Sequence, residues 1–399
     1  MIARISQTFL TYFPAGSIKQ RFARHTLWST LGSVAAQAAN LLGSILLSRL
    51  LGKATFGELG MINSTIGTIG LLAGISLAST STKYIAEYRS QNPERAGKIL
   101  GLSLSIGTII GGLASLLLVI FAETLAVRVF NSTTLTPEFR VSGVILFFTT
   151  MNGIQLGALA GLEDFKAIAW VNMLRAGLIL ACYALGALWG GLIGVMVGLG
   201  VANAVLFAVT HFFVNRSCTR YGISIRWRLD SHELPILYQF SLPSYLTDLL
   251  VGGAAWFGNT LLVNQVDGYA EMGIFLAAYQ WRTAAMFLPA ILTQISVPIL
   301  ANLYGAGDQV KFRKVVAGNL GVVFLITALI VAPLLLLSPW IMASYGEGYA
   351  EQAHVMVIVM LTVLITSLGG VIGSMLVSMG KLWQLFAINL AWGIGFVAI

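Results

Sequence analysis

Eleven long apolar runs constrain this chain more than any other feature of its sequence. A helix needs roughly 20 mostly apolar residues to cross the hydrocarbon core of a bilayer. The runs cover about residues 26–50, 57–81, 99–121, 141–162, 167–189, 190–214, 240–264, 271–300, 315–337, 353–378 and 383–399. A barrel strand would instead show a short, weak alternation of polar and apolar residues. The sequence therefore predicts an all-α polytopic membrane protein.

The composition agrees with a chain that lies mostly in lipid. Only 10% of its 399 residues are charged, 57% are hydrophobic, and the mean hydropathy is +0.85. A soluble domain needs more charge to cover its surface. The net charge of +8 could suggest a nucleic-acid partner, but the basic residues flank the apolar runs. That distribution indicates anionic lipid and a fixed membrane orientation, and no nucleic acid.

Lysine and arginine residues predict the orientation of the spans. With a cytoplasmic N-terminus, 17 of the 23 fall in cytoplasmic segments and four on the opposite side. The remaining two, Arg175 and Arg282, lie inside spans. Cytoplasmic loops carry the excess of such residues in membrane proteins. We therefore expect a multi-pass protein of the plasma (inner) membrane with its N-terminus in the cytoplasm.

The chain repeats itself at an offset of 216 residues. The segment from Gly52 to Gly57 matches the segment from Gly268 to Gly273, and Lys98 matches Lys314. With one residue of slippage, Asn172 matches Asn389. The offset carries each span to the span six places later, and six is even. The two copies therefore face the same way, as in a parallel repeat whose pseudo-two-fold axis runs along the membrane normal.

The repeat predicts two helical lobes around a central cavity. We expect a cytoplasmic tail over residues 1–24, an N-lobe of six spans over 25–214 and a charged cytoplasmic linker over 215–239. A C-lobe of five spans follows over 240–399. Because the second lobe is one span short of the first, the repeat predicts a further helix beyond Ile399 and hence a truncated C-lobe.

Motifs for enzyme chemistry are missing from the sequence. It has no G-x-x-x-x-G-K-[ST] phosphate loop and no H-E-x-x-H metal motif, and its four histidines are scattered. Two cysteines, Cys182 and Cys218, are too few for a disulfide framework or a cysteine metal site. We expect no cofactor, no metal and no catalytic residue.

Polar residues at helical spacing predict where a cavity could lie. Ser33, Gln37, Asn40 and Ser44 share one face of the first span, and Ser241, Ser244, Asp248, Gly252, Ala255 and Asn259 share one face of the seventh. Such stripes either hold helices together or line a wet cavity. For Asn63, Gly67, Gly70 and Gly74 on the second span we favour packing, since most are glycine.

Three ionisable residues lie near the middle of spans. Arg175, Asp248 and Arg282 each sit roughly 12–16 Å from the nearer span end at 1.5 Å per residue. A charge at that depth usually forms an ion pair or has a function. Asp248 could balance Arg282, carry a coupling proton, or cap backbone near Pro243. Arg282 is the better candidate for substrate, because we expect the span of Arg175 at the periphery of its lobe.

Several loose motifs resemble the polysaccharide-transporter (O-antigen flippase) family. They are Arg49 to Gly57, Gly74 to Ala78, Thr82 to Tyr88, Ala160 to Asn172, Phe240 to Ser244 and Ala277 to Trp281. The resemblance implies the fold of the multidrug/oligosaccharidyl-lipid/polysaccharide exporters, with a cavity lined by spans 1, 2, 7 and 8. It also implies export of undecaprenyl-pyrophosphate-linked oligosaccharide from the inner to the outer leaflet. The family often has an acid where Asn259 stands.

The function predicted from the sequence is therefore a lipid-linked oligosaccharide flippase. Its predicted substrate and cavity residues are Arg282, Asp248, Gln37, Asn40, Asn259 and Arg175. Expected partners are the polyprenyl-pyrophosphate-linked oligosaccharide, anionic lipids, and the polymerase and glycosyltransferases of the same pathway. The alternatives are a cation-coupled multidrug antiporter, a peptidoglycan-precursor flippase and, from another class, a membrane-embedded glycosyltransferase or ligase. The sequence specifies neither the glycan, nor the energy source, nor the oligomeric state.

Overall fold

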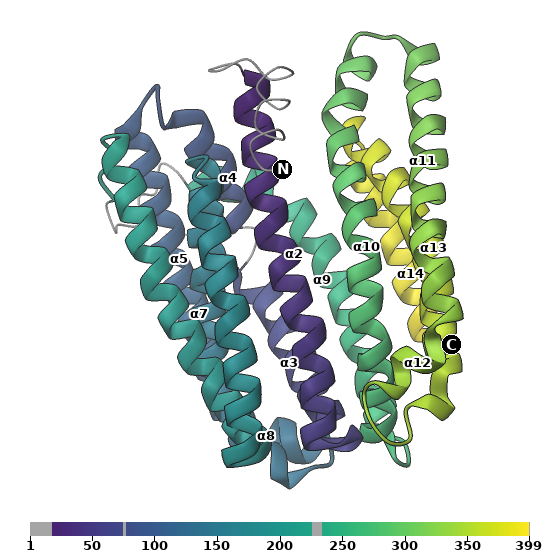
Figure 1. Ribbon diagram of the computed structural model, residues 1–399. Coiled ribbons are helices and arrows are strands. Elements are labelled where there is room, and N and C mark those ends of the chain that lie inside the picture. Colours follow the sequence, from purple (N-terminus) through teal and green to yellow (C-terminus); the bar gives the residue numbers. More distant parts are fainter. Residues whose placement is uncertain (1–17, 75–76, 226–233, 399) are drawn as a thin grey trace, which may run out of the picture.

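The computed structural model describes residues 18–74, 77–225 and 234–398, and that part of the chain consists of helices and short turns without a strand (Figure 1). Residues 1–17 of the predicted tail and 226–233 of the predicted linker lie outside the described residues. Two lobes stand side by side, the first built from α2 to α8 and the second from α9 to α14. We call them the N-lobe and the C-lobe.

The N-lobe follows the predicted order of spans. Its helices are α2 (Ile18–Leu51), α3 (Lys53–Gly74), α4 (Leu77–Tyr88), α5 (Pro93–Ile120), α6 (Ala122–Thr124), the π-helix η1 (Leu125–Val129), the 3-10 turn η2 (Thr133–Leu135), α7 (Thr136–Gly161) and α8 (Phe165–Arg220). The long α8 reverses direction at Gly191, whose φ of 57° is left-handed. Glycine adopts that conformation without steric cost, so this turn joins the fifth and sixth predicted spans directly.

The C-lobe continues with the same pattern. Its helices are α9 (Leu234–Val263), α10 (Gly268–Gly305), α11 (Gln309–Leu336), α12 (Ser338–Ala343), the 3-10 turn η3 (Ala350–Gln352), α13 (Ala353–Ser378) and α14 (Leu382–Ala398). The eighth span is one helix of 38 residues despite Pro289 and Pro298. Its counterpart in the N-lobe, the predicted span over 57–81, comprises α3 and the start of α4, and residues 75–76 between these helices lie outside the described residues.

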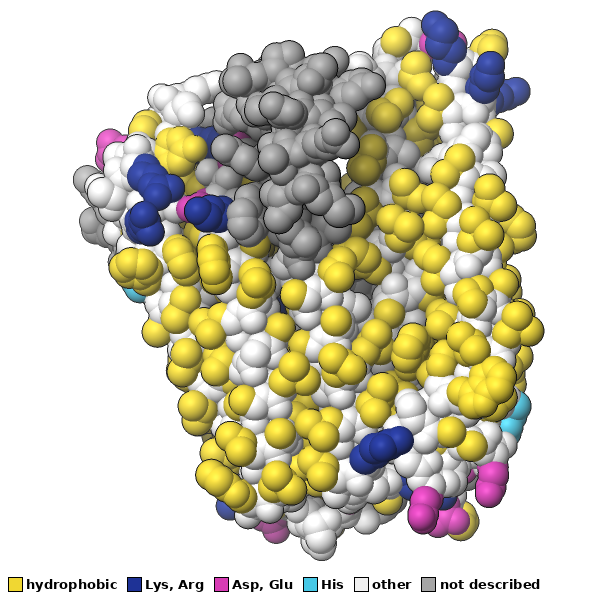
Figure 2. All heavy atoms as spheres, viewed as in Figure 1, with side chains coloured by type: hydrophobic (Ala, Val, Ile, Leu, Met, Phe, Trp, Pro, Cys, Tyr) yellow, Lys and Arg dark blue, Asp and Glu magenta, His cyan; other side chains and the backbone are white. Residues whose placement is uncertain are grey.

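Seven helices in the described residues are long and apolar enough to cross a membrane. One of them is α8, which contains two predicted spans, and shorter apolar stretches occur on α9 (Leu249–Val263) and α14 (Leu382–Phe396). Hydrophobic side chains cover the middle of the visible face, and most charged side chains lie near its two ends (Figure 2). This distribution confirms the predicted class of an all-α polytopic membrane protein.

Helix boundaries confirm the internal repeat. Helix α5 begins at Pro93 and α11 at Gln309, which is 216 residues later, and their last residues differ by the same 216. Helices α7 and α13 are related by 217 residues at both ends. The one-residue slippage therefore falls between α6 and η2, in a turn that can absorb an insertion. The side chains of Asn92 and Asp308, also 216 apart, cap α5 and α11 at the same position.

A symmetric contact joins the two lobes. A Cβ added to Gly57 of α3 would collide with the carbonyl oxygen of Tyr269 on α10, and one added to Gly273 would collide with the carbonyl oxygen of Lys53. These four residues are two pairs related by the offset of 216. Each lobe thus presents the same patch to the other, as in an isologous two-fold interface. The contact fits a parallel repeat.

Candidate functional site: the region between the lobes

Helix α2 is tied to the turn between α12 and η3. Ser48 donates to the hydroxyl of Tyr349 over 2.6 Å, and the hydroxyls of Ser44 and Tyr345 are 3.1 Å apart. Arg49 Nε donates to the backbone carbonyl of Ser344 over 2.6 Å. Ser44 and Ser48 are buried and one turn apart on α2, so both reach the same turn of the C-lobe.

A second set of hydrogen bonds joins the turn after η1 to the start of α10. Asn131 donates to the side-chain oxygen of Asn264, and Asn264 donates to the backbone carbonyl of Val129 over 2.9 Å. The Tyr269 hydroxyl donates to the carbonyl of Phe130 over 2.8 Å. Together with the α2 contacts, these bonds define what we call the joined end of the molecule. From there the two lobes diverge toward the splayed end, at which α2 begins (Figure 1).

Asn259 lies in the contact between α9 and α3. Its amide donates to the hydroxyl of Ser64 over 3.0 Å, and one turn earlier Trp256 donates to Thr65 over 3.0 Å. The predicted polar stripe of the seventh span therefore reaches the partner lobe at Asn259. An acid at this position, as the family often has, would accept from Ser64 instead of donating to it.

One part of the polar stripe of α2 contacts the C-lobe, and another part has an unused hydrogen-bond donor among the described residues. Ser44 bonds to Tyr345. Gln37 has a buried side-chain nitrogen with no hydrogen-bond partner among the described residues. Asn40, one turn from Gln37, is only partly buried. A buried amide nitrogen without a partner costs stability, so Gln37 has a donor available for a ligand or for water.

Arg175 lies beside α2. Gly32 on α2 packs against Ala169 and Asn172 of α8, and Gly43 packs against Tyr183. Arg175 lies between those two contact levels on α8, and Gln37 lies between them on α2, so the two residues are at the same depth. The first half of α8, which is the predicted fifth span, therefore packs along α2, a helix expected to line the cavity. The peripheral position expected for this span stays a prediction.

Arg282 lies on α10 next to an aromatic pair. Its guanidinium carbon is 5.2 Å from the ring centre of Tyr279, and that ring is 5.8 Å from the ring of Phe275. Tyr279 is 42% exposed. A cation over an aromatic face is weakly stabilised, so the ring orients the guanidinium without neutralising it. The counterpart of Arg282 in the N-lobe, Ile66, is a buried core residue.

Neither arginine forms an ion pair with a carboxylate of the described residues, where the ion pairs include Arg89–Glu163, Lys98–Glu94, Arg220–Asp164 and Lys311–Asp308. The side chain of Asp248 lies outside the described residues, although its backbone belongs to α9. The predicted pairing of Asp248 with Arg282 thus stays a prediction. In the described part, no three His, Cys, Asp or Glu side chains gather into a group that could hold a metal ion.

Sequence reasoning missed Tyr345 and Tyr349. They lie in a short segment that shows no periodicity, and no sequence pattern indicates that they contact α2. Both are fully buried, and burial raises the pKa of Tyr345 and raises that of Tyr349 to about 12. Their hydroxyls therefore stay protonated at physiological pH and keep bonding to Ser44 and Ser48.

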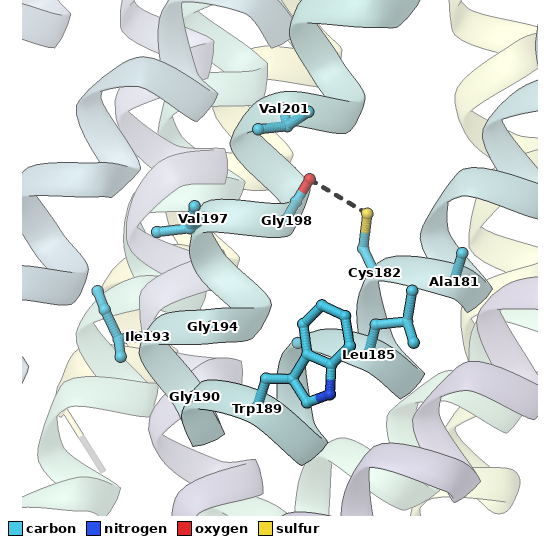
Figure 3. Close-up of a pocket in the computed structure, with 11 residues that line it drawn as sticks. Ala181, Cys182, Leu185, Trp189, Gly190, Ile193, Gly194, Val197, Gly198 and Val201 are labelled. Carbon is cyan, nitrogen blue, oxygen red and sulfur yellow. Dashed lines mark hydrogen bonds between the residues drawn. The ribbon is translucent and has the colours of Figure 1, made fainter.

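A groove of about 510 Å³ lies within the hairpin of α8 in the N-lobe (Figure 3). Gly186 and Gly194 let the two halves of α8 approach closely. Apolar residues such as Ile193 and Val197 line the groove, and Trp189 beside them is 85% exposed. Within the groove, the Cys182 thiol donates to the carbonyl of Gly198 over 3.2 Å, so this hydrogen bond joins the two halves of α8. The groove contains no charged side chain, so it cannot hold the charged part of a substrate.

Comparison with known families identifies the chain's relatives. The family described as "Polysaccharide biosynthesis protein" matches residues 22–304, well over half of the chain. The chain belongs to this family. The resemblance to polysaccharide transporters found in the sequence is thereby confirmed.

Two curated relatives are transport proteins of the bacterial envelope. The "EPS I polysaccharide export inner membrane protein EpsE" of Ralstonia nicotianae is 24% identical over 92% of this chain and 83% of that protein. The "Lipid III flippase" of Escherichia coli K12 is 23% identical over 70% of this chain and 67% of that protein. This chain is accordingly a multi-pass membrane protein from a family of polysaccharide and lipid-linked glycan exporters.

A solved structure shows the same fold. A MATE family multidrug transporter of the MOP superfamily, in an inward-facing conformation, superposes with a TM-score of 0.75. The match covers 91% of this chain and 87% of that chain at 17% identity. The predicted exporter fold, with two helical lobes, is therefore confirmed.

Proposed function

We propose that this protein flips an undecaprenyl-pyrophosphate-linked oligosaccharide from the inner to the outer leaflet for surface polysaccharide synthesis. Membership of the polysaccharide biosynthesis family and the names of the two relatives support a lipid-linked glycan as cargo. The pathway's glycosyltransferases and polymerase would then be its partners, and anionic lipids would surround its basic segments.

The splayed end faces the cytoplasm in this proposal. The excess of Lys and Arg on the side of the N-terminus supports that orientation. The lobes are joined at the other end through the contact of Gly57 with Gly273 and the bonds of α2 to Tyr345 and Tyr349. A cargo headgroup would enter from the splayed end, and export would require the joined end to separate while the splayed end closes.

The observation that carries the proposal is the arginine on α10 without a carboxylate partner in the described residues. A guanidinium at mid-membrane depth is costly unless something compensates its charge. A diphosphate would compensate it, because guanidinium stays charged when desolvated and can bond two phosphate oxygens at once. Arg282 is therefore the proposed contact for the pyrophosphate.

The N-lobe would contribute to the same site from its side. Arg175 and Gln37 lie at one depth on adjacent helices, and the Gln37 side-chain nitrogen is an unused donor. Arg175 would attract the diphosphate, and Gln37 and Asn40 would donate to phosphate or sugar oxygens. The proposed sequence is binding between Arg282 and Arg175, rocking of the lobes, and release as the joined end opens.

The test replaces Arg282 in cells that need this protein for surface glycan. One good hydrogen bond to a charged group is worth about 1.5–3 kcal/mol, so Arg282→Ala should lower export roughly 10- to 100-fold. Arg282→Lys keeps the charge but loses the two-pronged geometry and should retain part of the export. Arg313→Ala, which removes an exposed cation at the start of α11, is the control and should export normally.

Surface glycan and membrane-inserted protein are both measured by immunoblot. Full export by Arg282→Ala at wild-type protein level would refute the diphosphate contact. Equal loss in Arg282→Ala and Arg313→Ala would also refute it, because that result indicates a general effect of positive charge.

A further inference from the structure

Two glutamates lie at the joined end, and the proposed transport mechanism does not use them. Glu138, at the start of α7, is only 7% exposed, and its Oε2 atom has no hydrogen-bond partner among the described residues. Glu58, on α3, is half-buried and directly follows Gly57. Helices α3 and α7 pack against each other, and both glutamates lie near the starts of these helices, so the two carboxylates are close enough for their charges to repel each other.

The contact between the lobes surrounds this pair. Gly57 packs against Tyr269 and Gly273, and Glu58 is close enough to Tyr269 for an electrostatic interaction. The Tyr269 hydroxyl bonds to the carbonyl of Phe130, whose ring stacks on Phe139 at 5.3 Å between centres. Separation of the lobes at this end would break these contacts and admit water to both carboxylates.

Basic groups near the joined end do not compensate the pair. Arg49 of α2 donates to the carbonyl of Ser344, and the Lys53 side chain extends toward Gly348. Arg128 of η1 and Arg140 of α7 are exposed, and no ion pair within the described residues includes either glutamate. The acidic groups Glu123 of α6 and Glu271 of α10 could only add to the repulsion.

Binding of one proton would remove the repulsion between the two carboxylates. A buried carboxylate with one unpartnered oxygen and a second carboxylate beside it are not both charged at low cost, so they share one proton as a coupled pair. We propose that Glu58 and Glu138 form a proton-binding site that holds one proton while the lobes are joined and releases it to solvent when they separate. This inference rests on the fold and on the joined end, and not on the identity of the cargo.

Linkage gives the sign of the effect. If joining the lobes takes up a proton, then acid favours the joined state, and a rise in pH favours separation of this end. One proton changes the ratio of joined to separated molecules by at most about tenfold per pH unit. Under the proposed orientation the site senses the pH outside the cell.

The experiment measures the distance across the joined end in purified protein in lipid nanodiscs. Spin labels are placed at Thr133→Cys in the N-lobe and at Val266→Cys in the C-lobe, both exposed, in a background without Cys182 and Cys218. The short-distance population should be several-fold larger at about pH 5 than at about pH 8 by the one-proton linkage. Glu58→Gln/Glu138→Gln should show the acid-like population at both values, because glutamine imitates the protonated acid.

The matched control is Glu123→Gln, which removes an exposed carboxylate at the same end and should leave the pH response unchanged. If the double variant does not fold, the half-buried Glu58→Gln alone should reduce the response. An undiminished pH response in the glutamine variants would overturn the proposal. So would a wild-type protein whose distances do not change between the two pH values.

Discussion

The two ends of the molecule use polar side chains in opposite ways. At the joined end, most groups that bridge the lobes are neutral, as Ser48 bonds to Tyr349 and Asn131 bonds to Asn264, and Arg49 adds one charged donor to the carbonyl of Ser344. At the splayed end, ion pairs stay within one lobe, as Arg89 pairs with Glu163 and Lys311 with Asp308. Neutral hydrogen bonds exchange readily for bonds to water, because each contributes only about 1 kcal/mol net.

This difference indicates which contacts hold each lobe together and which must break. Arg89 also donates to the carbonyl of Gly161 over 2.9 Å, which fixes α4 against the end of α7. Asp164 accepts from Ser217 over 2.6 Å and caps α8 at Ala167, which fixes the ends of α7 and α8. The N-lobe is therefore tied together at the splayed end, and the joined end is where the lobes can part.

The largest expected effect comes from a methyl group at the symmetric contact. Gly57→Ala should force the backbones of α3 and α10 apart and shift the Thr133–Val266 distance distribution toward separation, at a cost of about 3 kcal/mol. Gly67→Ala, on the same helix but with open space around its position, should instead be neutral or stabilising by up to about 1 kcal/mol. Equal behaviour of the two variants would show that the contact does not limit the approach of the lobes.

A smaller effect is expected when a tie within the N-lobe is cut. Arg89→Ala removes the bond to Gly161 and the ion pair with Glu163, and should destabilise the protein by about 2 kcal/mol. Thermal unfolding in detergent measures this loss, while the label distance across the joined end should not change. Lys98→Ala removes an exposed pair with Glu94 and should cost about 0.5 kcal/mol or less. A changed label distance in Arg89→Ala would contradict the separation of roles.

The smallest effect concerns one bond across the joined end. Ser48→Ala and Tyr349→Phe should each weaken the joined state by about 1 kcal/mol, and the double variant should add little to either. The label distances of the wild type, the two single variants and the double variant are compared in a double-mutant cycle. Additive losses would mean that the two hydroxyls act independently.

The hydrogen bond between Ser48 and Tyr349 depends on pH in a different range from the proposed pair of Glu58 and Glu138. Burial raises the pKa of Tyr349 to about 12, so the stability that its neutral hydroxyl contributes is complete below about pH 10. That contribution is lost only as the pH rises from there through the pKa in the folded protein. A pH response of the joined end between about pH 5 and pH 8 therefore cannot come from this bond, and it should be the same in Tyr349→Phe.

The sequence predicted the repeat because equivalent positions in the two lobes have the same structural roles, such as a turn glycine or a helix cap. Gly52, Asn92 and Lys98 recur 216 residues later as Gly268, Asp308 and Lys314, and the helix ends of α5 and α11 follow the same offset. Apolar runs of membrane length predicted the helices for the same reason, since lipid allows few other structures. Arg282 and Arg175 were recognisable because a charge inside an apolar run is rare.

Long-range packing decided the rest. No local pattern shows that Gly57 opposes Tyr269, that α2 meets Tyr345 and Tyr349, or that the first half of α8 lies beside α2. Glu58 and Glu138 are 80 residues apart and lie at the ends of two helices, so each looks like an ordinary surface acid.

The sequence determined the helices, their repeat and the unusual charges within them, because those depend on chain-local chemistry and on lipid. The tertiary structure decided which of those groups meet across the lobes, because that depends on how the helices pack.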